Sequence, residues 1–192
     1  MRQSLSVLML ASCCVASCCV ACGSGGGELD PAVVNHLPDG DALGAAASGT
    51  YRLRLTTRAC SGACPTLEVL GFTVSTCKVG GSETETVVLT QSGGHLRADV
   101  KVNGARVPLL SGGLFSDGEF DVGGAGVADP HLVEPLATGA LDYAARAQGT
   151  LTPAGQVSGE VRLLIKGTLL GTSLSCQLTE ELAGSREAGS RD

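Results

Sequence analysis

The sequence predicts an all-β protein whose strands form one antiparallel up-and-down barrel of 8–9 strands; a two-sheet β-sandwich is the alternative. Three observations predict this class. Apolar and polar residues alternate with a period of two through most of the chain after Thr50, the pattern of half-buried strands. Glycine-containing turn signals separate the alternating segments, and no helical period is sustained. A meander of this length must protect its edges, and closing into a barrel does so.

The first strand is expected to begin at Thr50, because Tyr51, Leu53 and Leu55 alternate with polar residues. Further strands are expected at 67–78, 84–91, 95–102, 105–107 and after Pro108, within a small hairpin over 114–122, and at 141–148, 157–165 and 174–178. The predicted turns are Gly80-Gly81, Ser92-Gly93-Gly94, Asn103-Gly104, Asp117-Gly118, Pro153-Ala154-Gly155 and Gly167 to Gly171. Asn-Gly between alternating segments is the strongest short-range hairpin signal.

Two stretches interrupt this pattern. Pro108 has no backbone N–H, so the strand that contains it is expected to be short or to lie at an edge. Residues 123–139 lack periodicity and contain two prolines, so they predict an irregular loop. Loops of this length are uncommon and are either functional or mobile.

The first twenty-seven residues predict export from the cytoplasm. Arg2 provides a positive start, residues 4–21 are apolar or small, and a Gly/Ser run follows Cys22; this is the organisation of a cleaved signal peptide. The stretch resembles the signal peptide of bacterial lipoproteins. The motifs that carry the resemblance are Leu10-Ala11-Ser12-Cys13, Val15-Ala16-Ser17-Cys18 and Cys19-Val20-Ala21-Cys22. Cys22 is the favoured acylation site and Cys18 the alternative.

The resemblance implies a lipid anchor and an address. Lipoproteins that stay in the inner membrane carry an aspartate directly after the acylated cysteine. Here Gly23 follows Cys22, so the resemblance implies the outer membrane or cell surface. The competing interpretations are an ordinary secretory signal with incidental cysteines and an uncleaved transmembrane anchor. A spanning helix needs about twenty apolar residues, whereas serines occur throughout this run.

Four segments follow from these boundaries. Residues 1–21 are the expected lipoprotein signal peptide, 22–49 a flexible tether, 50–182 the β-barrel domain and 183–192 a disordered tail. The tether interpretation allows one short helical turn around Pro31 to His36. An inserted inhibitory arm is the alternative for this segment.

Charge and composition exclude several classes of function. Removing the signal takes away only Arg2 from the basic residues, which leaves 12 Lys+Arg against 19 Asp+Glu, or about −7. That balance argues against nucleic acid as a partner, because phosphates require a positive face. With 28 glycines, no tryptophan, three phenylalanines and two tyrosines, the core must be built mainly from Leu, Val and Ala.

The cysteines of the body predict disulfides. Cys60, Cys64, Cys77 and Cys176 form an even set in an exported chain, which indicates two bridges. Of the three pairings, Cys60–Cys64 with Cys77–Cys176 is preferred over Cys60–Cys77 with Cys64–Cys176. A zinc site is the alternative use of four thiolates, but paired C-x2-C knuckles are missing.

No catalytic motif is found, and an enzyme is not expected. His36, His95 and His131 are interpreted as solvated or hydrogen-bonded side chains. Oxygen-rich side chains that could hold calcium occur at Asp129, His131 and Glu134 and at Asp117, Glu119 and Asp121. Their spacing matches no calcium loop, so neither a metal nor a cofactor is predicted. Arg52, Arg54 and Arg58 form a basic stripe that is expected to pair with Glu160, Glu180 and Glu181 across the sheet.

The body of the chain resembles the small lipocalin-like barrels of exported bacterial lipoproteins. The resemblance rests on Gly49-Thr50-Tyr51, the segment 90–96, Gly149-Thr150-Leu151 and the segment 157–161. Lipocalins proper open with Gly-x-Trp, and avidin-type barrels line their pocket with tryptophans. This chain has no tryptophan, which argues against biotin binding.

The expected protein is an exported, membrane-anchored, monomeric lipoprotein with a binding or structural role. If the barrel is hollow, its Leu/Val/Ala lining predicts a small apolar ligand such as a lipid tail. The alternative is a surface protein-interaction module, such as an inhibitor of a secreted hydrolase, with a filled barrel. A cavity would favour the ligand carrier and a packed interior the interaction module.

Overall fold

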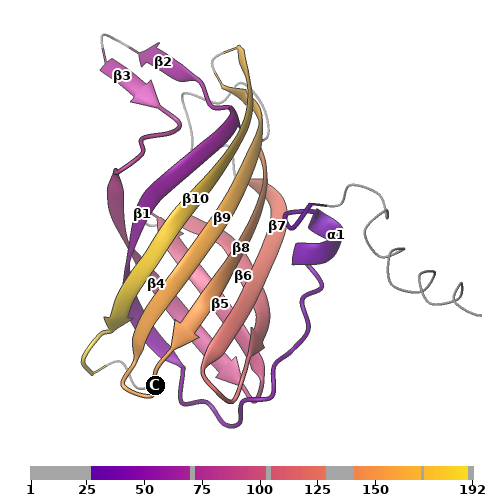
Figure 1. The fold of residues 1–192 in the computed structure, drawn as a ribbon, viewed down its shortest axis with the longest axis vertical. Helices are drawn as coiled ribbons and strands as arrows, with labels where there is room; N and C mark the ends of the chain where they lie inside the picture. The colour runs from indigo at the N-terminus through magenta and orange to yellow at the C-terminus, as the bar shows by residue number, and fades with distance from the viewer. Residues whose placement is uncertain (1–26, 70–71, 103–104, 129–140, 170, 190–192) are drawn as a thin grey trace, which may run out of the picture.

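The protein is a closed, antiparallel, eight-stranded barrel with consecutive strands side by side (Figure 1). The computed structural model describes residues 27–69, 72–102, 105–128, 141–169 and 171–189. The barrel strands are β1 (Gly49–Ala63), β4 (Ser82–Ser92), β5 (His95–Val102), β6 (Ala105–Leu114), β7 (Glu119–Ala128), β8 (Leu141–Leu151), β9 (Gln156–Leu169) and β10 (Thr172–Arg186). This confirms the predicted barrel over the sandwich.

Strand β1 closes the barrel because it pairs with both β4 and β10. Tyr51 is opposite Val87 on one side and Arg186 on the other. Tyr51 and Leu53 are buried while Arg52 and Arg54 are exposed, so the predicted alternation of this strand is confirmed. Every barrel strand has a neighbour on both sides, which protects most of the sheet's edges. Between β6 and β7, however, the pairing within the described residues extends only from Ser111 to Leu114 on β6.

Tight glycine turns connect the strands at one end, as the sequence predicts. Gly93, Gly118 and Gly155 all have positive φ, at 61°, 90° and 79°, a conformation that glycine adopts without steric cost. At the turn between β6 and β7, the Gly118 N–H donates to the Phe115 carbonyl at 3.0 Å. The predicted Asn103-Gly104 turn lies outside the described residues.

Strand β6 runs through Pro108 for ten residues, so the expected short strand was wrong. The expected edge is found locally, because β6 pairs with β7 only from Ser111 to Leu114, and among the described residues Pro108 has a neighbouring strand only on the β5 side. The β5–β6 ladder is irregular at this point: Ala98 pairs with Leu110, but the next pair is Val100 with Val107. A proline is tolerated at such an irregularity because no ladder hydrogen bond requires its N–H.

Strand β7 extends to Ala128, so the loop predicted over 123–139 was wrong for residues 123–128. The glycines that masked the strand pattern have a packing role. A Cβ at Gly123 would lie 2.9 Å from the Val34 carbonyl oxygen, and Asn35 accepts a hydrogen bond from the Ala125 N–H at 2.7 Å. The small residues let helix α1 (Pro31–Val34) lie directly on the outer face of β7. The remainder of that loop, with Asp129, His131 and Glu134, lies outside the described residues.

The segment before β1 is packed on the barrel, which corrects the expected flexible tether for residues 29–48. The predicted helical turn forms α1: Asp30 caps it by accepting from the Ala32 N–H at 2.8 Å, and Val34 is fully buried. The chain then crosses the closed end of the barrel (Figure 1), where the Gly40 N–H donates to Gly94 and the Ala42 N–H to Leu114.

Strand β10 continues to Arg186, so residues 183–186 of the predicted disordered tail are part of a strand instead. Ala183 pairs with Arg54 of β1 and Ser158 of β9. The last residues of this strand are polar or small and carry no alternation signal. Their strand conformation follows from the two neighbouring strands that pair with them.

The predicted strand over 67–78 is instead a hairpin, β2 (Thr66–Val69) with β3 (Phe72–Ser75), outside the barrel sheet. Two disulfides join its flanking segments to the barrel: Cys60–Cys77 and Cys64–Cys176. The preferred pairing, Cys60–Cys64 with Cys77–Cys176, was therefore wrong and the alternative is correct. Because β1 continues to Ala63 beside β10 and Gly62 pairs with Cys176, Cys64 is brought next to Cys176.

The two disulfides are expected to contribute unequally to stability. They close loops of 17 and 112 residues, for which the chain-entropy model gives about 3 and nearly 5 kcal/mol respectively. Replacing Cys64 and Cys176 with alanine should therefore lower the free energy of unfolding more than replacing Cys60 and Cys77. Denaturant unfolding of the two double variants under oxidising conditions measures this difference. An equal loss in both would contradict the loop-length explanation.

Candidate functional site

The barrel encloses a cavity of about 600 Å³. Every barrel strand contributes at least one described side chain to its wall. Most of this lining is aliphatic, with one phenylalanine. The apolar lining residues are Leu53, Leu55, Val87, Leu89, Leu96, Ala98, Leu110, Phe120, Val122, Leu141, Ala145, Ala147, Leu151, Val157, Val161, Leu163, Ile165, Leu178 and Leu182. The volume is within the range of pockets that enclose small-molecule ligands.

One end of the barrel is closed by a hydrogen-bonded cluster around Tyr51. Its hydroxyl donates to the Ala47 carbonyl at 2.9 Å and accepts from Arg186 Nε at 3.0 Å. The Arg186 guanidinium lies 5.4 Å from the centroid of the Tyr51 ring, a cation–π arrangement. Beside it, Gln91 is buried and accepts from the Ala47 N–H at 2.8 Å. This cluster fixes the segment that crosses the barrel end.

The opposite end has a polar rim. Strand β4 begins at Ser82, opposite Thr56, whereas β1 continues to Ala63, so the wall is shorter on the β4 side. Ser75, Thr76 and Lys78, from the end of β3 and the segment after it, line the cavity there. The Cys60–Cys77 bridge attaches this segment to β1.

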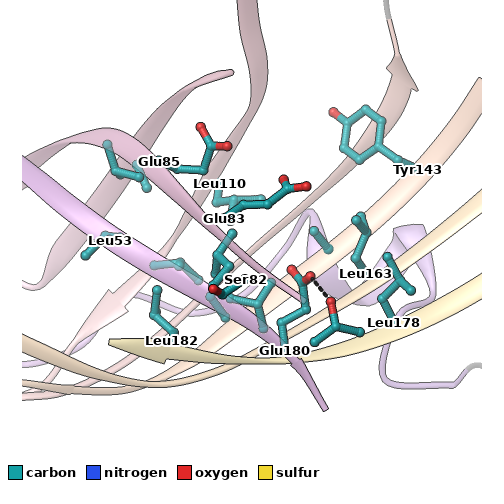
Figure 2. A pocket seen from close by; sticks show the side chains of 18 of the residues that line it. Leu53, Ser82, Glu83, Glu85, Leu110, Tyr143, Leu163, Leu178, Glu180 and Leu182 are labelled. Carbon is teal, nitrogen blue, oxygen red and sulfur yellow. Dashed lines mark hydrogen bonds between the residues drawn. The ribbon is translucent and has the colours of Figure 1, made fainter. Parts of the chain in front are cut away.

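Three glutamates project into the cavity (Figure 2). Glu83 and Glu85 are on β4, and Glu180 is on β10. All three face the same side of the sheet as buried apolar residues. Glu85 is two residues before buried Val87, and Glu180 is two residues after buried Leu178. Glu180 accepts a hydrogen bond from the Thr57 hydroxyl at 3.1 Å.

Their surroundings disfavour negative charge on two of these glutamates. Partial burial raises the pKa of Glu180; the Thr57 hydrogen bond opposes that rise and the charge of Glu83 adds to it. Partial burial also raises the pKa of Glu85, again with a contribution from Glu83. Tyr143, on the wall at β8, has its pKa raised by burial. The site therefore holds carboxylates in a partly apolar environment.

The polar candidates taken from the sequence lie elsewhere. His95 contacts Asp39 through Nδ1 at 2.6 Å on the surface, and His36 contacts the Ala32 carbonyl. Asp121 forms a bidentate pair with Arg146, at 2.9 and 2.6 Å, and Asp117 accepts from the Glu119 N–H. Among the described residues, no group of three or more His, Cys, Asp or Glu side chains is placed to hold a metal.

The expected cross-strand pairing of the basic stripe is found in part. Arg58 forms an ion pair with Glu181 on the outer face. Arg52 instead contacts Glu187 at 3.8 Å, Arg54 donates to the Ser82 hydroxyl, and Glu160 pairs with Arg162. Glu180 faces the interior and bonds Thr57, so its expected pairing with the basic stripe was wrong.

The acidic lining was missed because glutamates in strands are ordinarily solvated. The signal was present: Glu83 and Glu85 share the alternation phase of Val87 and Leu89, and Glu180 shares that of Leu178 and Leu182. Side chains two residues apart in a strand lie on the same face. Extending the apolar phase of β4 back from Val87 by two and by four residues reaches Glu85 and Glu83, and Glu180 lies in the same phase between Leu178 and Leu182.

The predicted lipidation sites, Cys22 and its alternative Cys18, lie outside the described residues. Within the part of the chain that the structure covers, no helix has the length and apolar character to cross a bilayer. The sequence matches no protein-family model and no curated protein.

The raised pKa of Glu180 makes a prediction about stability and pH. A carboxyl with a raised pKa in the fold binds its proton more tightly than in the unfolded chain, so stability is lost as pH rises from the ordinary value of 4.5 through the folded pKa. Glu180→Gln, which keeps a partner for Thr57, should therefore raise the denaturation midpoint relative to the native protein at about pH 7 and less at about pH 4.

Glu181→Gln is the matched control, because Glu181 is the next residue, faces outward and pairs with Arg58. It should give no gain at neutral pH. A Glu180→Gln effect that is the same at both pH values would contradict the assignment of a raised pKa.

Proposed function

We propose that this protein is an exported, lipid-anchored carrier that binds a small apolar ligand inside its barrel. The observation that carries the proposal is the 600 Å³ cavity with its aliphatic lining. It is closed at one end by the Tyr51 cluster and has a polar rim at the other. Ligand pockets combine such apolar walls with a few polar groups. A module that acts only through surface loops would not need this internal volume.

The closed end supports the lipocalin-like resemblance. Tyr51 is the third residue of Gly49-Thr50-Tyr51, where lipocalins carry tryptophan. Its ring is fully buried beneath Arg186 of the last strand. A smaller aromatic residue thus occupies the position at which the first and last strands meet.

The two disulfides support an extracytoplasmic location, because such bridges persist mainly in oxidising compartments. The proposed anchor would be short. Leu29 is buried on the barrel and is seven residues after Cys22, which spans at most about 25 Å when extended. An acyl group on Cys22 would therefore hold the barrel close to the surface of the outer membrane.

Filling the cavity should weaken ligand binding. Ala145 and Ala98 point into the cavity from β8 and β5, so Ala145→Phe and Ala98→Phe should each lower the affinity for a neutral apolar fluorophore, N-phenyl-1-naphthylamine, by about tenfold or more, since the ring occupies the space that the probe needs. Fluorescence titration measures this affinity, with circular dichroism as the check on folding.

Val127→Phe is the matched control, because Val127 lies on the outer face of β7 and is 61% exposed. It should leave probe binding unchanged. Failure of the native protein to bind the probe, or equal loss in all three variants, would refute an internal binding site.

The anchor has its own test. The native protein expressed with its signal in a bacterium and extracted from the membrane fraction should carry acyl groups on an N-terminal Cys22, which intact-mass measurement identifies. Cys22→Ala should remove the acyl mass and release the protein to the soluble fraction. Cys18→Ala should keep the acyl mass and remain in the membrane fraction. Acylation that is lost only with Cys18→Ala would move the site to the alternative cysteine.

A further inference from the structure

The ionisable side chains that line the cavity are mostly acidic. Its described lining contains three glutamates and one basic residue, Lys78. Lys78 is exposed, on the segment between β3 and β4, whereas Glu85 and Glu180 are only partly accessible. Among the described residues, the charged side chains that project into the cavity from the barrel strands are therefore all acidic, and they lie on β4 and β10.

The three glutamates gather on both sides of one strand. Strand β1 lies between β4 and β10 in the sheet; Leu55 is opposite Glu83, Leu53 is opposite Glu85, and Thr57 is opposite Glu180. Figure 2 shows Glu83, Glu85 and Glu180 among the leucines that line the same pocket. Apolar surface and negative charge are thus neighbouring parts of one cavity.

From this arrangement we infer that the ligand is a cationic amphiphile, with an aliphatic body against the Leu/Val wall and an amine head group among Glu83, Glu85 and Glu180. The inference rests on the proposed function and gives its ligand a charge. The head group of such a ligand complements the charge of the lining, and its tail complements the apolar area.

Other head groups fit less well. A fatty-acid carboxylate would place a fourth negative charge beside three others, and like charges in a partly apolar site disfavour ionisation. A neutral head group would leave two partly buried carboxylates without a counter-charge. Within the described residues no hydrogen bond or ion pair to Glu83 or Glu85 competes with a ligand, and Glu180 has one neutral partner, Thr57.

The glutamates also oppose the stability of the isolated barrel. Burial and mutual repulsion raise the pKa of Glu85 and Glu180, which means that their ionised forms are disfavoured by the fold. Groups with perturbed pKa values in a cavity are characteristic of functional sites. A bound cation would reverse the perturbation by favouring the charged carboxylates.

The test compares three ligands with the same twelve-carbon chain: dodecylammonium, dodecanol and dodecanoate, each at pH 7 and below the concentration at which it forms micelles or separates from solution. Displacement of N-phenyl-1-naphthylamine gives the three affinities. Dodecylammonium should bind about tenfold or more tightly than dodecanol, and dodecanoate more weakly than dodecanol, because several partly screened charge contacts act together. The preference should shrink at high salt.

The triple variant E83Q/E85Q/E180Q assigns the preference to these residues. It should bring dodecylammonium to the affinity of dodecanol and leave dodecanol binding intact, which also reports folding. The triple variant E119Q/E160Q/E181Q has the same net charge but changes glutamates that are not part of the cavity lining; it should keep the full preference.

The outcomes separate the two proposals. Binding of dodecanol with no preference for dodecylammonium, a preference for dodecanoate, or a preference retained in E83Q/E85Q/E180Q would overturn the cationic ligand and leave the apolar carrier standing. Failure of all three ligands and of the fluorophore would overturn the proposed function itself.

Discussion

The structure depends on the closure of β1 against both β4 and β10. Because Tyr51 is opposite Val87 and Arg186, the first and last strands of the barrel meet at a buried aromatic side chain. The hydroxyl of the same residue donates a hydrogen bond to the Ala47 carbonyl. Closure satisfies the backbone groups that an open meander would expose. Closure also fixes which side chains of each strand point inward, since a shift of one residue in the pairing would exchange the inner and outer faces of that strand.

The residues that build the wall explain why a closed barrel encloses space. Alanines at positions 98, 145 and 147 face inward, and Phe120 is the only described phenylalanine that lines the cavity. Gly149 and Gly159 pair with each other on neighbouring strands, where a Cβ on either would collide with the opposite backbone. Eight strands give an interior that side chains can just fill, so a chain poor in aromatic residues leaves a cavity.

The two ends of the barrel have different chemistry. At the closed end, polar side chains such as Gln91 and Arg186 are hydrogen-bonded within the protein. At the rim, Glu83 and Glu85 face the cavity beside the shortened wall of β4, and the disulfides attach the β2–β3 region to the same side. Internal satisfaction at one end supports a structural role there, and carboxylates in a partly apolar cavity at the other support recognition.

The sequence by itself determined the fold class, the turns at Gly93, Gly118 and Gly155, and the faces of strands such as 51–55, because alternation and glycine conformational freedom are local properties. It failed for β7, where glycines that receive α1 removed the alternation, and for residues 29–48, whose polar pattern hides their packing against the barrel. Only the tertiary structure decided the disulfide pairing and the acidic cavity. Both depend on register: which side chains become neighbours is set by barrel closure, which joins residues more than a hundred positions apart, such as Thr57 and Glu180.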